Sequence, residues 1–144
     1  MTGAGKRLGR EIALQFARQG WDVAVHYGRS QLEAEKTVAE IQGLGMRSSA
    51  FQADLAIEDS VGSLFAEVSR QFPHLHCLVN SASIFQYDRA NSNTPLSGKS
   101  LLDHLQVNLL APILLAQCMF AFQKEKKQTP DVVPSVIQLL DQKL

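Results

Sequence analysis

A glycine-rich segment at residues 2–9 leads directly into an amphipathic stretch at residues 10–18. Glycine lets the backbone adopt positive φ and approach a ligand closely, and a helix N-terminus offers unpaired N–H groups and a partial positive charge. Lys6 and Arg7 add formal charge. This combination suits a pyrophosphate, so we predict a dinucleotide-binding turn. Because the spacing departs from the six-residue G-x-G-x-x-G fingerprint, an ordinary tight turn is the alternative. The permissive positions are Gly3, Gly5 and Gly9.

Strand-like and helix-like patterns alternate along the rest of the chain. Short apolar runs predict strands, and apolar residues at helical spacing predict helices. Gly20 and Gly45 are placed to end the first two helices, and the second helix is expected to turn Leu32, Val38 and Ile41 inward. The alternation predicts an α/β fold with a parallel sheet. The predicted strands are residues 23–27, 49–52, 77–79 and 136–140, and the predicted helices are residues 10–18, 31–41, 57–72 and 101–122.

Size and composition exclude several classes of protein. A chain of 144 residues is enough for one domain, and 14 basic against 14 acidic residues give no reason to expect binding to nucleic acid or an anionic membrane. The apolar stretch at residues 105–122 contains Asn108 and Pro112, which favours a core or interface helix over a membrane span. No signal peptide is recognised. Cys77 and Cys118 form no C-x-x-C motif, so we expect buried thiols in a reducing, cytoplasmic compartment. The 4 histidines have no zinc-type spacing, and no metal site is predicted.

Four motifs in order resemble the short-chain dehydrogenase/reductase family, and the resemblance covers essentially the whole chain. It implies a Rossmann-like, doubly wound parallel sheet, and we expect residues 1–144 to form one partial NAD(P)-binding domain. The usual second Asn of the third motif is replaced by Ser81, a modest departure. The motifs are Thr2-Gly-x-x-x-Arg7-x-Gly9, Asp54-Leu55, Asn80-Ser81-Ala82-Ser83 and Val107-Asn108.

Within the family, the chain most resembles the pteridine reductases. Those proteins favour an arginine in the turn, as at Arg7, and an aspartate at the end of the fifth strand, as at Asp141. They also carry His-Tyr-x-Arg-Ser after the second strand and Ala-Ser-x-Phe after the Asn-rich turn. The matching residues are His26, Tyr27, Arg29 and Ser30, followed by Ala82, Ser83 and Phe85.

The resemblance implies roles for individual residues. Asn108 and Asp141 would be catalytic, with Asn108 holding a water in a proton relay and Asp141 supporting proton delivery. Arg7, Ser83 and Phe85 would face the substrate, although a plain hydrophobic plug is the alternative for Phe85. The residues that would bind the cofactor are Gly3, Lys6, Arg7, Leu8, Gly9, His26, Tyr27, Arg29, Ser30, Asp54, Leu55, Asn80, Ser81 and Ala82.

The segment after the strand at residues 23–27 favours NADP(H) over NAD(H). NAD sites place a carboxylate there for the ribose diol, whereas this chain has Arg29 and Ser30. A guanidinium and a hydroxyl suit a 2′-phosphate. Ser30 could also cap the following helix, and both roles are compatible.

Asn108 needs a partner because it interrupts an apolar helix, where an unsatisfied amide is costly. Pro112 lies four residues later and has no N–H for the carbonyl of Asn108. We therefore expect a kink with a free carbonyl that could anchor a water. The alternative is a purely structural kink with a satisfied Asn.

Two parts of the family pattern are not found in this sequence. A Tyr-x-x-x-Lys pair would supply the proton donor, but Tyr27 and Tyr87 have no lysine four residues later. Only Met1 precedes Thr2, so the first strand is expected to be missing. In the order 3-2-1-4-5 its absence would divide the sheet into two pieces with unpaired edges. We expect a fragment of a longer enzyme that is inactive alone.

The function implied is that of an NADPH-dependent reductase, most like a pteridine reductase, acting on a pterin C=N bond or a carbonyl. The first alternative is another reductase of the family, of the 3-oxoacyl thioester type. The second is a catalytically dead nucleotide-binding or interaction module. Since the helix at residues 105–120 is more apolar than one sheet face requires, and since this helix meets a partner subunit in the family, the full-length protein is expected to be a homo-oligomer.

Overall fold

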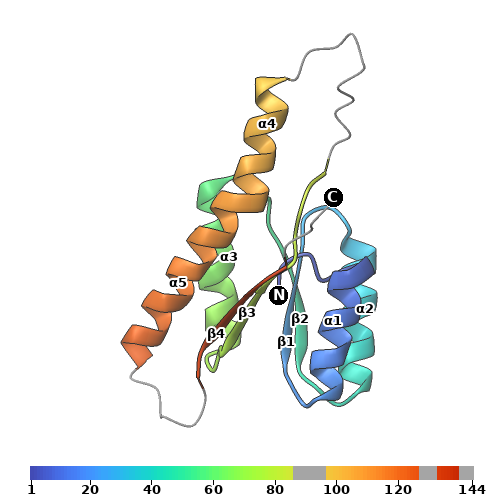
Figure 1. The fold of residues 1–144 in the computed structure, drawn as a ribbon. Coiled ribbons are helices and arrows are strands. Elements are labelled where there is room, and N and C mark those ends of the chain that lie inside the picture. The colour runs from blue at the N-terminus through green and yellow to red at the C-terminus, as the bar shows by residue number, and fades with distance from the viewer. Residues whose placement is uncertain (86–96, 127–132, 140–144) are drawn as a thin grey trace.

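The computed structural model describes residues 1–85, 97–126 and 133–139. Helices and strands alternate over most of this length, as the sequence pattern predicts, and Figure 1 shows their arrangement. The helix α1 begins at Arg7, three residues before the predicted start. The elements in chain order are α1 (Arg7–Arg18), β1 (Val23–Tyr27), α2 (Gln31–Gly43), β2 (Ser48–Gln52), α3 (Glu58–Gln71), β3 (Cys77–Asn80), α4 (Gly98–Leu105), the π-helix η1 (Gln106–Leu110), α5 (Ala111–Lys126) and β4 (Ser135–Gln138).

The described strands form two separate two-stranded sheets. Strand β1 pairs in parallel with β2, and β3 pairs in parallel with β4. The division of the sheet into two pieces is therefore confirmed. Because both pairs are parallel, the carboxyl ends of β1 and β2 lie together, as do those of β3 and β4.

Helices cover both faces of the strands. Figure 1 shows α1 and α2 on one side and α3 with α5 on the other. Alternate residues of β1 divide between the two layers: Val23 and Val25 pack in the core under α1 and α2, and Ala24 packs in the core under α3 and α5. In β2, Phe51 joins the second of these cores. Side chains of successive strand residues point to opposite faces, so the pattern is that of a doubly wound α/β sheet.

Residues 1–4 lie between β1 and β3 and connect the two sheets. The Met1 carbonyl accepts from the His26 N–H at 3.1 Å, and the Thr2 N–H donates to the Val79 carbonyl at 2.9 Å. The expectation that the facing edges of β1 and β3 are wholly unpaired is thus wrong at their carboxyl ends. Toward their amino ends, a cavity of about 340 Å³ separates the strands, and its lining includes Val23, Ala24, Cys77 and Val79. We call this space the inter-sheet slot.

Two further details of the predicted elements are wrong. Leu32 is 70% exposed, because α2 turns Ala34, Thr37 and Ile41 inward at spacings of three and four residues. Strand β4 ends at Gln138, two residues earlier than predicted.

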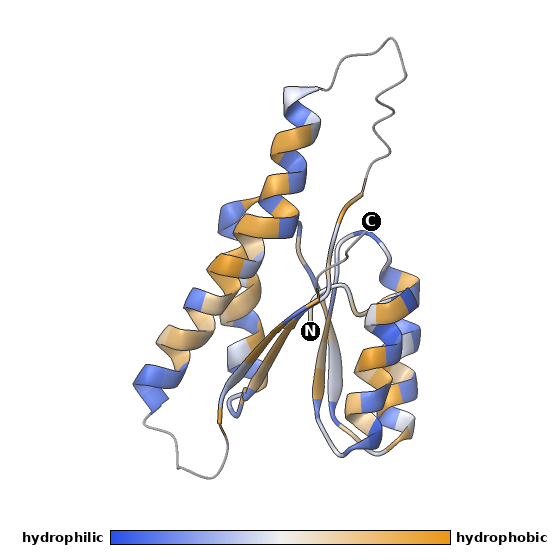
Figure 2. Cartoon of the chain, in the orientation of Figure 1, coloured by the Kyte–Doolittle hydropathy of each residue, from blue (hydrophilic) through white to orange (hydrophobic). Residues whose placement is uncertain are grey.

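The segments α4, η1 and α5 run on as one long helix. Its buried residues recur every four positions at Val107, Ala111, Leu115 and Met119. The predicted disturbance before Pro112 takes the form of the π-helix η1, which accommodates the missing proline N–H by a wider turn. By length and composition this helix could cross a membrane, a test that core helices of water-soluble proteins also pass. Figure 2 shows apolar residues along most of its length, between polar ends. Those left exposed are Leu101, Leu102, Leu105, Leu109, Leu110, Ile113 and Phe120.

Candidate nucleotide-binding site

The glycine-rich turn starts in a left-handed conformation. Gly3 has φ of 62°, and a Cβ at this position would lie 2.8 Å from the Cα of Ala82. Lys6, the residue before α1, is extended, and its side chain caps no N–H group. The N–H groups at the N-terminus of α1 are therefore available next to the glycine-rich turn, as an anion-binding site requires.

Gly9 allows the turn to fold back on its own helix. A Cβ on Gly9 would lie 2.2 Å from the Gly3 carbonyl oxygen and 3.1 Å from the Ser81 hydroxyl. Such distances exclude any side chain unless the backbone moves. The glycines at both positions are thus required by the close approach of the turn to residues 81–82.

Thr2 joins the turn to the segment after β3. Its buried hydroxyl oxygen accepts from the N–H groups of Ser81 and Ala82, each at 3.0 Å. The sequence pattern assigns Thr2 to a motif but gives it no role at the site. In the sequence, only its position before the first glycine could have indicated this role, because its hydrogen-bond partners lie 79 and 80 residues away.

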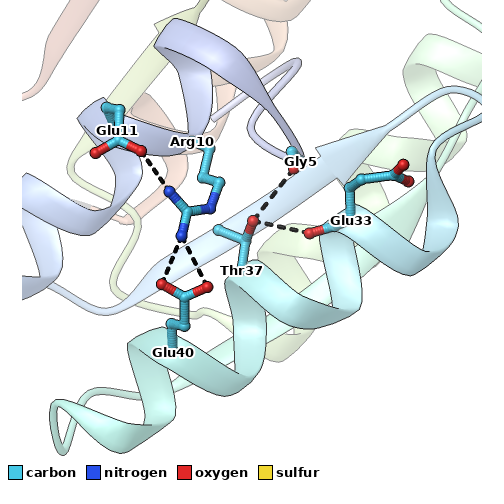
Figure 3. Close-up of polar contacts among 6 residues, drawn as sticks. All are labelled: Gly5, Arg10, Glu11, Glu33, Thr37 and Glu40. Carbon is cyan, nitrogen blue, oxygen red and sulfur yellow. Dashed lines mark hydrogen bonds and ion pairs between the residues drawn. The ribbon is translucent and has the colours of Figure 1, made fainter.

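Helix α2 holds the other side of the turn, as Figure 3 shows. The buried Thr37 hydroxyl lies 3.3 Å from the Gly5 carbonyl and 2.9 Å from the Glu33 carbonyl. Arg10 of α1 donates to both carboxylate oxygens of Glu40 at 2.8 and 2.6 Å and also pairs with Glu11. These contacts fix the direction of α1, and hence of its N-terminus, against α2.

His26, near the end of β1, has both of its ring nitrogens hydrogen-bonded. The Gly3 N–H donates to Nδ1 at 3.2 Å, so Nε2 carries the proton and donates to the Ala53 carbonyl at 3.1 Å. The side chain is buried, and burial lowers the pKa of His26 to about 4. The imidazole is therefore neutral and held in one tautomer.

Acidification is expected to destabilise the chain through this histidine. Its pKa falls from 6.5 to about 4 on folding, so the unfolded state takes up the proton first and stability is lost as the pH drops through this interval. The full loss is on the order of 3 kcal/mol. The buried Met1 amine, with a pKa lowered from 8.0 to about 6 by burial, adds a loss of the same sign at higher pH.

Urea unfolding from about pH 8 to about pH 4 would measure this dependence. A His26→Gln variant should show a shallower fall below about pH 6.5, because it lacks the titrating ring. If the free energy of unfolding fell equally steeply with pH in the variant and the wild-type chain, His26 would not be the group responsible.

The segments after β1 and β2 complete the edge on the predicted adenine side. Arg29 is exposed, and Ser30 precedes α2 without a side-chain cap. The Asp54 carboxylate accepts from the Ala56 N–H at 3.0 Å, which closes a tight turn. Leu55 is buried in the core. The structure thus brings Arg29, Ser30 and Asp54 to one edge and gives Leu55 a packing role.

The predicted substrate side lies after β3. Asn80 is buried, and its amide donates to the Pro112 carbonyl at 3.5 Å, while its Oδ1 has no partner among the described residues. Asn108 has one partner residue for both ends of its amide: Oδ1 accepts from the Ile84 N–H and Nδ2 donates to the Ile84 carbonyl, each at 2.9 Å. These bonds fix the segment that carries Ser83 and Phe85, both exposed. Asp141 lies outside the described residues.

The geometry fits a phosphorylated nucleotide. Lys6, Arg7 and Arg29 are exposed at this edge, and among the described residues the ion pairs are those of Arg10 with Glu11 and Glu40. A pyrophosphate-binding turn combines three features, and all three are present here. The cations are unpaired within the described ranges, the helix N-terminus is uncapped, and the turn packs too closely for a Cβ at its glycines. No group of three or more metal-ligating side chains occurs in the part of the chain that the structure describes.

Two parallel strand pairs with helices on both faces, and with this turn at their carboxyl ends, define the doubly wound α/β class of fold. Residues 1–133 match the family model described as short chain dehydrogenase. The chain belongs to this family.

Individual relatives agree with this assignment. The 3-oxoacyl-[acyl-carrier-protein] reductase FabG of Staphylococcus aureus is 46% identical over 84 residues, which cover 58% of this chain and 34% of that protein. A solved structure, FolM alternative dihydrofolate reductase 1 from Brucella canis complexed with NADP, superposes with a TM-score of 0.81 at 31% identity, covering 97% of this chain and 53% of that one. A short chain dehydrogenase from Burkholderia cenocepacia in complex with NADP gives a TM-score of 0.74 at 38% identity, covering 81% and 46%. The chain thus spans about a third of the curated relative and about half of the solved structures.

Proposed function

We propose that residues 1–144 form the NADP(H)-binding part of a short-chain reductase that acts on the carbonyl of a 3-oxoacyl thioester. The observation that carries this proposal is the junction of the glycine-rich turn with the ends of β1 and β3 through His26 and Thr2. The substrate class rests on the likeness to the staphylococcal 3-oxoacyl reductase. Bound NADPH would supply the hydride.

The chain's own residues would bind and orient this cofactor. The turn from Gly3 to Gly9 and the N-terminus of α1 would hold the pyrophosphate. Arg29 and Ser30 would bind the 2′-phosphate, and the Asp54 loop would lie beside the adenine. No tyrosine of the chain is followed by lysine four residues later, so we propose nucleotide binding without turnover for these residues alone.

A second candidate is reduction of a pterin. The likeness to the Brucella protein named as an alternative dihydrofolate reductase extends over nearly the whole chain, and Arg7, Ser83 and Phe85 match the pteridine-reductase pattern. These residues lie in the turn and in the segment fixed by Asn108, where a substrate could meet both.

Calorimetric titration of the 144-residue chain with NADPH tests the proposal. Binding is expected, without NADPH oxidation. The NADPH-loaded chain is then titrated with acetoacetyl-CoA and with dihydrobiopterin. Binding of the thioester supports the first candidate, and binding of the pterin alone replaces it with the second. Binding of neither leaves a nucleotide-binding module, and failure to bind NADPH rejects the whole proposal.

The preference for NADPH is expected to depend on Arg29. An Arg29→Ala variant should lose about tenfold or more in affinity for NADPH and little for NADH, since a charge-assisted hydrogen bond to the 2′-phosphate is lost. Arg18→Ala is the matched control, because it removes an exposed arginine at the C-terminus of α1, away from the proposed site at its N-terminus. Equal losses for both nucleotides would show that Arg29 does not read the 2′-phosphate.

We also propose that the exposed apolar residues of the long helix mediate self-association. Leu105 and Leu109 are 45% and 54% exposed, and burial of such side chains favours association. Sedimentation velocity should show an oligomer that a Leu105→Glu, Leu109→Glu variant converts to monomer. Leu32→Glu, at a similarly exposed leucine on α2, should leave the oligomer intact. A monomeric wild-type chain would contradict this prediction.

A further inference from the structure

We propose that His26 is a positioning residue for nucleotide binding: its ring holds the glycine-rich turn and the Ala53–Asp54 segment at a fixed separation, without contacting the nucleotide itself. This role replaces the direct contact that the family resemblance implies for this histidine. The inference rests on the proposed function, because it concerns how the same site is kept in shape.

The geometry of the ring carries the inference. Nδ1 accepts from the Gly3 N–H at 3.2 Å and Nε2 donates to the Ala53 carbonyl at 3.1 Å. The side chain is only 5% exposed. Both nitrogens are thus used by the protein, and neither remains for a ligand.

The ring is rigid, so the positions of its two partners are coupled. The backbone of His26 is fixed as well, since its N–H donates to the Met1 carbonyl and its carbonyl accepts from the Ala4 N–H. Gly3 begins the turn that would hold the pyrophosphate, and Ala53 precedes the Asp54 turn on the adenine side. Among the described residues, His26 is the side chain whose hydrogen bonds reach both segments. A shift of the ring would therefore move one wall of the site relative to the other.

Two conservative variants separate the two bonds. In His26→Asn, the amide oxygen can take the place of Nδ1 and accept from Gly3, but the side chain is too short to reach Ala53. In His26→Gln, the amide NH₂ can take the place of Nε2–H and donate to Ala53, while the bond to Gly3 is lost. His26→Ala removes both bonds.

Ser48→Ala is the matched control. The Ser48 hydroxyl is buried and donates to the Val23 carbonyl at 2.8 Å. It joins the same two strands, β1 and β2, but at their amino ends, away from the site. Its loss should lower the thermal midpoint in the same way as loss of a His26 bond, without changing nucleotide affinity.

The test compares NADP⁺ affinity, measured by calorimetry at a temperature where circular dichroism shows every variant to be folded. His26→Ala should bind about tenfold or more weakly, because two hydrogen bonds that hold the site are lost. The Asn and Gln variants should be intermediate, and Ser48→Ala should match the wild-type chain. Equal affinities for His26→Ala and Ser48→Ala would overturn the positioning role.

Hydrogen exchange without nucleotide gives an independent readout. Exchange of the Gly3 amide should accelerate in His26→Gln, and remain slow in His26→Asn and Ser48→Ala. If the wild-type chain does not bind NADP⁺, the proposed function fails. The hydrogen-exchange experiment still tests whether the His26 ring holds the glycine-rich turn. An unchanged Gly3 exchange rate in His26→Gln would overturn it. The two single-bond variants also decide the matter if His26→Ala does not fold.

Discussion

Replacing Gly9 by alanine is expected to abolish nucleotide binding and to lower the stability of the chain markedly. The added Cβ would lie 2.2 Å from the Gly3 carbonyl oxygen and 3.0 Å from its carbon. Both are backbone atoms, so relief requires the turn to move away from α1. Overpacking of this kind costs about 1–3 kcal/mol or more. Because the displaced turn is the proposed pyrophosphate cradle, NADPH affinity should fall beyond detection by calorimetry.

Gly62 provides the matched control for this substitution. It lies inside α3, and a Cβ there would meet nothing within 4 Å. Gly62→Ala should stabilise the chain by up to about 1 kcal/mol, because alanine favours helix over glycine, and should leave NADPH binding unchanged. A Gly9→Ala chain that melts and binds like the wild type would contradict the close packing of the turn.

Adding four apolar, β-branched residues ahead of Met1 is expected to raise the free energy of unfolding more than any other change considered. The alternation of hydrogen bonds shows which backbone groups face the inter-sheet slot. In β1, Val23 bonds toward β2 whereas Ala24 bonds to Met1. Just before β3, the His76 carbonyl bonds toward β4, whereas within β3 the Val79 carbonyl bonds to Thr2. Ala24, Val79 and Cys77, which is two residues before Val79, therefore face the slot.

An added strand would pair with these groups and bury apolar side chains. Each buried β-branched residue contributes about 1.5–3 kcal/mol before the cost of ordering it. The extension would also replace the Met1 amine, whose pKa burial lowers to about 6, by an uncharged peptide N–H. The net gain should be about 3 kcal/mol, or a rise of about 10 °C in the thermal midpoint.

A Gly-Ser extension of equal length is the control, since it can neither fill the cavity nor favour a strand. Thermal unfolding followed by circular dichroism compares the two extended chains with the wild type. The apolar extension should also sharpen the transition, because β1–β2 and β3–β4 would then unfold as one sheet. Equal midpoints for the two extensions would show that the slot does not accept a strand.

The local sequence determined the order and type of the elements. Short runs of three to five residues and helix-spaced apolar positions are local signals, and they placed every described strand and helix within a few residues. Motif order was enough to predict the family, and the expected absence of the first strand was enough to predict the division of the sheet. The expectation that Asn108 needs a partner also came from the sequence alone, because an amide in an apolar helix is costly wherever it lies.

Tertiary structure alone decided which side chains connect the elements. Thr2 bonds residues 79 and 80 positions away, His26 joins Gly3 to Ala53, and Thr37 reaches Gly5. Leu32 faces outward because the contacts of α2 with β1, β2 and α1 select which of its residues are buried. No local period encodes such contacts, since they depend on how parallel strands bring distant segments to one edge. The sequence therefore predicted a phosphate-binding turn, and only the folded chain revealed what holds that turn in place.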